Sequence, residues 1–197
     1  MVYVRAIEES TLTLIVSGKL WRNSLIMQDK ETGTLWSHIT GEALDGPHKG
    51  ESLETLPSVQ TTWAEWYAEH PDTRVLKKEQ EVLGSRYEKY FRDPERAGMF
   101  RVEWLRDRLP AKSIVYGVAR GPFSVAVTGD RLEIDPTIHT RVGGDSLLIQ
   151  KDDDGGVRAF VVATDDSAAD DSPTEVKVLP IFWFAWSNFY PRTDIID

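Results

Sequence analysis

The chain has 197 residues with 41% hydrophobic content, which is enough for one well-filled core, and we expect residues 1–197 to form a single compact domain. Its formal net charge of −9 at pH 7 is the opposite of what nucleic acids and anionic membranes attract, so neither is expected as a partner. There is no cysteine, which excludes disulfides, thiolate metal sites and cysteine nucleophiles.

The N-terminus shows no targeting segment. Met1 to Arg5 lead directly into alternating residues, without the basic start, apolar run and small-residue cleavage site of a signal peptide. No apolar run approaches the length that crosses a bilayer. As it stands, the chain is expected to be cytoplasmic.

The first segments predict antiparallel strands. Residues 2–8 and 11–17 are rich in β-branched residues and are separated by a short turn, which predicts an opening hairpin. Residues 24–28 predict a further strand, and the turn-forming residues 29–33 end it. The N-terminal part is therefore expected to form a small antiparallel sheet.

Residues 37–57 predict a long loop. Hydrophobic periodicity fades there, and Gly41, Gly46 and Gly50 permit backbone conformations that other residues avoid. A loop of about 20 residues inside a compact domain is usually functional or disordered. The tryptophans and glycines that punctuate this loop favour an ordered and functional segment.

The stretch around Trp63 and Trp66 predicts a short helix. A spacing of three places both indole rings on one helix face. Thr62 and Glu65 fit a capping box at its start, and Pro71 ends it after about two turns. So short a helix is unstable alone in water, and packing must hold it.

The same frame returns near the C-terminus with Trp183, Trp186 and Thr193, without a capping box. Residues 17–76 and 139–197 are therefore interpreted as an approximate internal pseudo-repeat. All four tryptophans are expected to anchor their helices onto sheets, each burial contributing roughly 4 to 6 kcal/mol as an upper bound. The alternative is an aromatic box for a ligand.

The remaining segments predict mostly strands. These strands are expected over residues 113–119, 123–127 and 131–134, and over a hairpin of 147–150 with 157–163. Residues 77–101 predict an excursion with one irregular helix, and the acidic residues 164–173 predict a solvated loop. The expected fold class is β-rich α+β, with antiparallel sheets in a barrel-like or sandwich-like arrangement and two short tryptophan-bearing helices related by internal duplication.

One histidine and carboxylate group is a candidate metal site. His38 and Glu42 are four residues apart and His48 follows in the same loop, so the three can meet if the loop folds on itself. Glu42 is also a candidate general acid or base. The alternative is that both histidines bond to backbone or water. Motifs for nucleotide, dinucleotide or serine-hydrolase chemistry are absent, and no cofactor is expected.

Residues 37–50 also form the candidate ligand site. Their glycines allow amides and carbonyls to face a small polar ligand, between tryptophans that are expected to be buried. The side chains expected to line this cavity are Asn23, Ser24, Trp36, Ser37, Thr40 and Glu42. The alternative is a structural cover whose motif residues only bond one another.

Several blocks of the chain carry a family resemblance. They are residues 17–27, 34–50, 61–63, 107–110 and 183–186, followed by Pro191 and Thr193. Through them the chain resembles, over most of its length, an uncharacterised prokaryotic family catalogued as domain of unknown function 3179.

The resemblance implies no assigned activity. Family members are often longer, are frequently exported, and carry a Cys-Pro-Leu segment upstream of the point where this sequence begins. Because the present sequence has no cysteine, the resemblance implies no thiol role here. Many relatives carry glutamine where this chain has His38, which argues against a metal site.

The leading hypothesis is a small-ligand-binding or structural module. The site would lie where residues 17–50 meet the first tryptophan helix. The alternative is a hydrolase or metal-assisted enzyme with its site in the same block. The sequence leaves open whether the protein is an enzyme, and it leaves the oligomeric state open.

Overall fold

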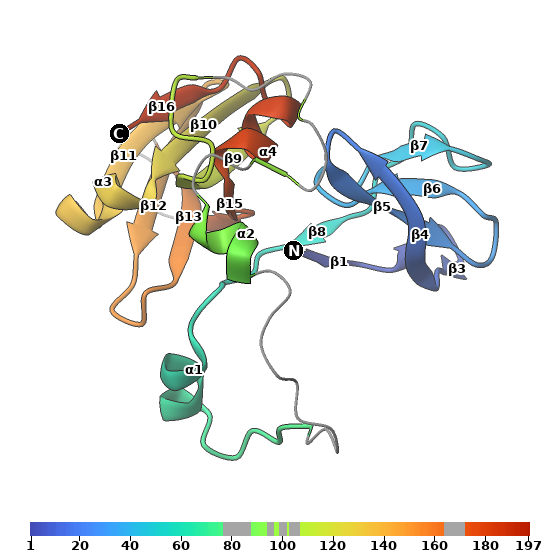
Figure 1. Cartoon of the computed structure of the whole chain (residues 1–197), viewed down its shortest axis with the longest axis horizontal. Coiled ribbons are helices and arrows are strands. Elements are labelled where there is room, and N and C mark those ends of the chain that lie inside the picture. The colour runs from blue at the N-terminus through green and yellow to red at the C-terminus, as the bar shows by residue number, and fades with distance from the viewer. Residues whose placement is uncertain (77–87, 94–96, 99–101, 103–106, 164–171) are drawn as a thin grey trace.

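The computed structural model describes residues 1–76, 88–93, 97–98, 102, 107–163 and 172–197. Within these residues the protein is β-rich α+β, as predicted, with several mainly antiparallel sheets and short helices. None of the described sheets closes into a barrel. An N-terminal unit (residues 1–57) and a C-terminal unit (residues 107–163 and 172–197) lie side by side, and the first tryptophan helix projects from them (Figure 1).

The N-terminal unit consists of short antiparallel strands. Its main sheet has the order β4 (Leu14–Trp21), β5 (Ser24–Asp29), β6 (Leu35–Ser37) and β7 (Ala43–Asp45). Two smaller pairs join β1 (Val2–Tyr3) to β8 (Thr55–Leu56) and β2 (Ala6–Ile7) to β3 (Ser10–Thr11). A small core around Leu12 and Trp36 lies against this sheet.

Strand pairing at the N-terminus differs from the prediction. The expected hairpin of residues 2–8 with 11–17 is reduced to the short β2–β3 pair, so its predicted extent is wrong. The long strand β4 pairs with β5 instead, across a two-residue turn at Arg22 and Asn23. Both turn residues have positive φ, 51° and 61°, as the tight turns of twisted hairpins require.

Residues 37–57 are not one long loop, because they contain β7 and β8. Close backbone approach explains two of their glycines. A Cβ on Gly46 would lie 2.7 Å from the Cα of Thr34, and one on Gly41 would lie 2.7 Å from the ring of Tyr3. Both glycines have positive φ, which other residues rarely adopt. The glycines therefore serve dense packing.

The C-terminal unit is a sandwich of two four-stranded sheets. One has the order β15 (Leu179–Phe182), β9 (Ile114–Arg120), β10 (Phe123–Thr128) and β16 (Asp194–Ile196). The other has the order β11 (Thr137–Val142), β12 (Asp145–Lys151), β13 (Val157–Val162) and β14 (Thr174–Val176). Only β10 and β16 pair in parallel among these strands.

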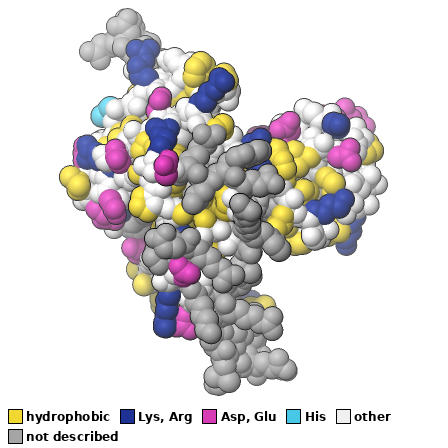
Figure 2. Space-filling view, turned by 45° about the horizontal axis from the view of Figure 1, so that its top comes forward, with side chains coloured by type: hydrophobic (Ala, Val, Ile, Leu, Met, Phe, Trp, Pro, Cys, Tyr) yellow, Lys and Arg dark blue, Asp and Glu magenta, His cyan; other side chains and the backbone are white. Residues whose placement is uncertain are grey.

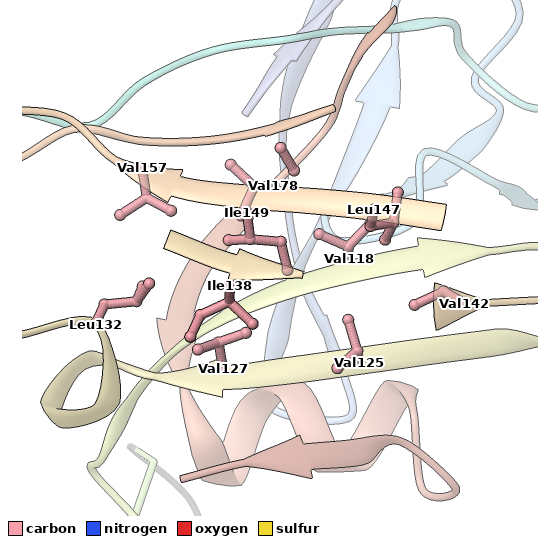
Figure 3. Packing of buried hydrophobic residues seen from close by; sticks show 11 residues of the cluster. Val118, Val125, Val127, Leu132, Ile138, Val142, Leu147, Ile149, Val157 and Val178 are labelled. Atoms are coloured by element: carbon pink, nitrogen blue, oxygen red, sulfur yellow. The ribbon is translucent and has the colours of Figure 1, made fainter. Parts of the chain in front are cut away.

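The side chains of β10 alternate between the two faces of the first sheet, and both faces are covered by other parts of the protein. Val127 points toward Ile138, and Val125 points into the same space between the sheets, as Figure 3 shows. Ala126 points to the opposite face and belongs to a second cluster with Trp183. Because successive side chains of a strand alternate between faces, one strand serves both cores.

The described helices are α1 (Trp63–Glu69), α2 (Glu88–Arg92), α3 (Gly129–Ile134) and α4 (Trp183–Phe189). Both tryptophan helices are confirmed, as is the capping box of Thr62 and Glu65 at α1. The strand predicted at residues 131–134 is wrong. Thr128 caps helix α3 there, its hydroxyl accepting from the Arg131 N–H at 3.2 Å.

Burial separates the two tryptophan helices. Trp183 and Trp186 of α4 are 0% and 1% exposed, whereas Trp63 and Trp66 of α1 are 54% and 43% exposed. The expectation that all four tryptophans anchor helices onto sheets is therefore right for α4 and wrong for α1. Helix α4 crosses the β9–β10 hairpin, whereas α1 projects away from both sheet units (Figure 1).

The two units touch through α4. Trp21 of the N-terminal unit meets Phe189 edge to face at 5.2 Å, and the Arg22 guanidinium donates to the Asn188 carbonyl at 2.8 Å. Ile39 joins the same buried cluster as Trp183. These contacts favour the single-domain interpretation, which stays a prediction, as does the internal duplication.

Two sequence predictions fall largely outside the described residues. The excursion over residues 77–101 is described chiefly at α2, and its longer course lies outside. The acidic loop over residues 164–173 is described only at residues 172–173, which are exposed.

Candidate functional site

The six predicted ligand residues do not line one cavity. Trp36 is fully buried, and its Nε1–H donates to the Asp29 carboxylate at 2.9 Å. Ser37 is also buried, and its hydroxyl accepts from the Thr40 N–H at 3.1 Å. Both side chains therefore stabilise the N-terminal unit.

The other predicted residues lie at turns or on the surface. Asn23 belongs to the β4–β5 turn, and Ser24 pairs with Trp21 beside it. Glu42 is exposed, and its carbonyl accepts from the Ser37 N–H at 2.8 Å. These contacts favour the alternative hypothesis for residues 37–50, a structural cover whose motif residues hydrogen-bond to one another.

The predicted metal ligands are not grouped. Among the residues that the structure describes, no three His, Asp or Glu side chains are arranged to hold a metal ion. His48 lies 3.3 Å from the carboxylate of Glu51, and its ring is tilted against Trp36 with the ring centroids 5.8 Å apart. Burial lowers the pKa of His38, and the nearby positive charge of Lys177 adds to this effect.

A cleft of about 440 Å³ lies where the two units meet. Thr40 and Thr55 line it from the N-terminal unit, and Trp186 and Tyr190 line it from the end of α4. Strands β9, β14 and β15, with Pro57 and with Lys177 from the link between β14 and β15, supply its remaining walls. Of the six predicted ligand residues, Thr40 alone is part of this cleft.

Lys177 is one of three described charged residues that line the cleft, with Arg120 and Glu175. Its amine donates to the Ile39 carbonyl at 3.1 Å and lies 5.4 Å from the centre of the Tyr3 ring. Burial lowers the pKa of Lys177 to about 8, because removal from water disfavours a charged amine. A carbonyl and an aromatic ring compensate only part of that cost.

Two largely buried tyrosines lie at or near the cleft, because Tyr190 lines it and the Tyr3 ring adjoins Lys177. The Tyr3 hydroxyl donates to the His38 carbonyl at 2.9 Å. Burial raises the pKa of Tyr3, with the proximity of Tyr190 adding to it, and burial raises the pKa of Tyr190 as well. Both phenols therefore stay neutral near pH 7 and keep their protons.

The other charges in the cleft have partners. Arg120 pairs with Asp145 at 2.8 Å, and Glu175 pairs with Arg158 at 3.2 Å. No carboxylate of a described residue forms an ion pair with Lys177. The cleft thus offers an amine whose charge is incompletely balanced by the described part of the chain.

A second hollow is less suited to a ligand. It measures about 970 Å³ and lies beside α3. Two of its charged residues, Arg131 and Glu133, already pair with Asp135 and Lys151. On the face in Figure 2, basic and acidic side chains are interspersed, without a patch of one sign.

Lys177 and Tyr190 are the residues that the sequence reasoning missed. One signal was available for Lys177, which interrupts an apolar run between Val176 and Val178. A cation in such a run is unusual and is rarely buried without a reason. Nothing local marks Tyr190, whose position depends on where α4 docks.

Comparison with known proteins gives a family and no activity. A family model described as a protein of unknown function, DUF3179, matches residues 1–193. The chain belongs to this family. Neither a search of curated proteins nor a search of solved structures found a match. No helix in the described part of the chain is long and apolar enough to cross a membrane.

Proposed function

We propose that this DUF3179 protein binds a small organic anion in the cleft between its two units. The observation that carries the proposal is the largely buried amine of Lys177, which lines the cleft without an ion-pair partner among the described residues. A ligand carboxylate would supply the missing negative charge. Charge-assisted hydrogen bonds of this kind are roughly twice as strong as neutral ones.

The remaining lining groups favour a ligand with an apolar body. The rings of Trp186 and Tyr190 contact each other at a tilt, with their centroids 4.1 Å apart, and Leu179 also lines the cleft. Thr40 and Thr55 supply hydroxyls from the N-terminal unit. Sites for small molecules combine apolar contact surface with a few placed polar groups, and this lining supplies both kinds.

Binding of simple carboxylates tests the proposal. Benzoate, phenylacetate and hexanoate are titrated into the protein and followed by saturation-transfer NMR and calorimetry, with benzamide as a neutral control. The carboxylates should bind and benzamide should not. Affinity should fall as the pH rises through about 8, because Lys177 then loses its proton.

Two variants locate the site. Lys177→Met should abolish carboxylate binding without loss of folding, because it removes a charge that burial disfavours. Lys19→Met, at an exposed position of β4, should leave binding unchanged. If none of the three carboxylates binds, or if Lys177→Met binds them as the wild type does, the proposal is wrong.

The competing hypothesis is a hydrolase or metal-assisted enzyme in residues 17–50. It needs His38, Glu42 and His48 as a group, and these side chains are dispersed. Metal analysis of the purified protein separates the two hypotheses. A stoichiometric transition metal, lost in a His38→Ala and His48→Ala double variant, would favour the enzyme.

A further inference from the structure

Helices α1 and α4 have the same local geometry. The Trp66 Nε1–H donates to the Thr73 hydroxyl at 2.9 Å, and the Trp186 Nε1–H donates to the Thr193 hydroxyl at 3.1 Å. The residue after each helix has nearly the same backbone, with φ and ψ of −125° and 64° after α1 and −124° and 69° after α4. Each helix with its following turn is thus one and the same structural element.

The α4 copy shows what this element packs on. Trp183 and Trp186 lie on the face of the β9–β10 hairpin that carries Val115 and Ala126. Gly117 makes room for the indole, because a Cβ there would lie 2.4 Å from the Trp186 ring. After the turn, β16 continues as a strand that pairs in parallel with β10. The receptor is therefore a hairpin with a glycine slot and an open outer edge.

The α1 copy carries the same groups, and the described residues provide no such receptor for it. Val75 and Leu76 occupy the positions of Ile195 and Ile196 in β16, and they are 67% and 87% exposed. Residues 74–76 form no strand in the described part of the chain. Exposed aromatic and aliphatic side chains that adjoin one another mark an interaction surface.

The base of α1 is nevertheless fixed. The Thr61 hydroxyl donates to the Asp154 carbonyl in the β12–β13 turn at 3.1 Å. The Glu65 carboxylate accepts from the Thr62 N–H at 3.0 Å, within the capping box. A preformed and anchored helix loses little conformational freedom when it binds a partner.

We propose that α1 and residues 74–76 dock onto a β-hairpin of a partner protein. The partner hairpin would present glycine, or another very small residue, under Trp66. Its free outer strand would pair in parallel with residues 74–76, as β10 pairs with β16. A second copy of this chain offers no free receptor, because α4 already covers its β9–β10 face.

One difference between the helices specifies the partner further. Glu69 stands at the position that Phe189 has in α4, and Phe189 meets Trp21 edge to face. Glu69 is exposed in α1. The partner should therefore carry Lys or Arg at this margin of the contact, where α4 finds an aromatic ring.

A peptide that mimics the known receptor tests the proposal. A backbone-cyclised peptide of residues 113–129, labelled with a fluorescent dye, is titrated with the intact protein and followed by anisotropy. We expect saturable binding. Trp66→Ala should weaken it by about tenfold or more, as truncation of an aromatic interface anchor does. Ile134→Ala, at an exposed apolar position on α3, should leave it unchanged.

The peptide itself supplies the matched control. A Gly117→Val peptide should not bind, because its side chain would fill the space of the indole. Absence of binding by the unmodified peptide, or equal binding by the Gly117→Val peptide or to Trp66→Ala, would overturn the proposal. A dimer that sedimentation detects in the wild type and not in Trp66→Ala would also overturn it, by making a second copy the occupant.

Discussion

Helices α1 and α4 share a sequence frame and a local geometry but differ in burial. Each is seven residues long and is followed by the same turn, closed by an indole-to-threonine hydrogen bond. Trp186 lies over the β9–β10 hairpin, whereas Trp66 faces outward. The frame therefore specifies a helix and its turn, and a separate receptor decides whether the tryptophans join a core.

The largest contrast should appear when one tryptophan of each helix is truncated. Trp183→Ala should lower the free energy of unfolding by about 3 to 5 kcal/mol, because it empties a buried aromatic site. Trp63→Ala should lower it by less than about 1 kcal/mol, as at other exposed positions. Urea unfolding measures both. Equal losses would mean that α1 is as well packed as α4.

The glycine slot offers a second way to separate the helices. Gly117→Ala should destabilise the protein by about 1 to 3 kcal/mol through overpacking, because its Cβ would lie 2.4 Å from the Trp186 ring. Its NMR signature should be local, shifting the Trp186 Nε1–H resonance and leaving that of Trp66 in place. Gly129→Ala is the matched control, because its Cβ would make only an ordinary contact of 3.6 Å. A similar loss in that control would argue against the slot.

The indole-to-threonine hydrogen bond that both helices share should contribute more to the stability of the protein at α4 than at α1. Thr193→Val should cost about 1 to 3 kcal/mol, because it leaves the buried Trp186 Nε1–H without an acceptor. Thr73→Val should cost about 0.5 kcal/mol or less, since water can replace the lost acceptor at a surface position. Thermal unfolding of both variants provides the measurement. The comparison fails if Thr73→Val proves the costlier change.

The smallest expected effect is a loss of helix stabilisation at acid pH. Of the two tryptophan helices, only α1 should show it. Hydrogen bonds from the Thr62 side chain, the Thr62 N–H and the Thr61 side chain lower the pKa of Glu65 below 4.5. A carboxyl whose pKa falls on folding stabilises the folded state, and this contribution is fully present above the unfolded-state pKa. The contribution is lost as the pH falls through the folded-state pKa. Helix α4 has no side-chain cap.

Acid titration by NMR checks this expectation. The Trp66 Nε1–H signal should change as the pH falls below the ordinary range of a glutamate carboxyl, because the hydrogen bonds to Glu65 delay uptake of its proton. The Trp186 signal should stay constant over the same range. Glu65→Gln should abolish the change at Trp66, and a titration that persists in that variant would contradict the assignment.

Much of the local structure could be predicted because its causes lie within a few residues. The capping box of Thr62 and Glu65 is confirmed, and the hairpin predicted at residues 147–150 and 157–163 is confirmed as β12 and β13. Helix α3 was missed because Thr128 and Gly129 also suit a turn between strands. Local signals fail where two local structures use the same residues.

The candidate site could not be predicted in this way. Thr40 was expected in a cavity and does line the cleft, but Lys177 approaches from the link between β14 and β15, near the other end of the chain. The hydrogen bond from Lys177 to Ile39 spans 138 residues. No local pattern encodes a contact over that distance.

The sequence by itself determined the β-rich class, the two tryptophan helices and their turns, because hydrogen bonds between near neighbours and alternating side chains produce them. The tertiary structure alone decided that α4 is buried and α1 exposed, and that Lys177 meets Ile39 in a cleft. Burial depends on which distant surface lies opposite a side chain. For Trp186 that surface includes Gly117, and for Trp66 the described chain provides no equivalent.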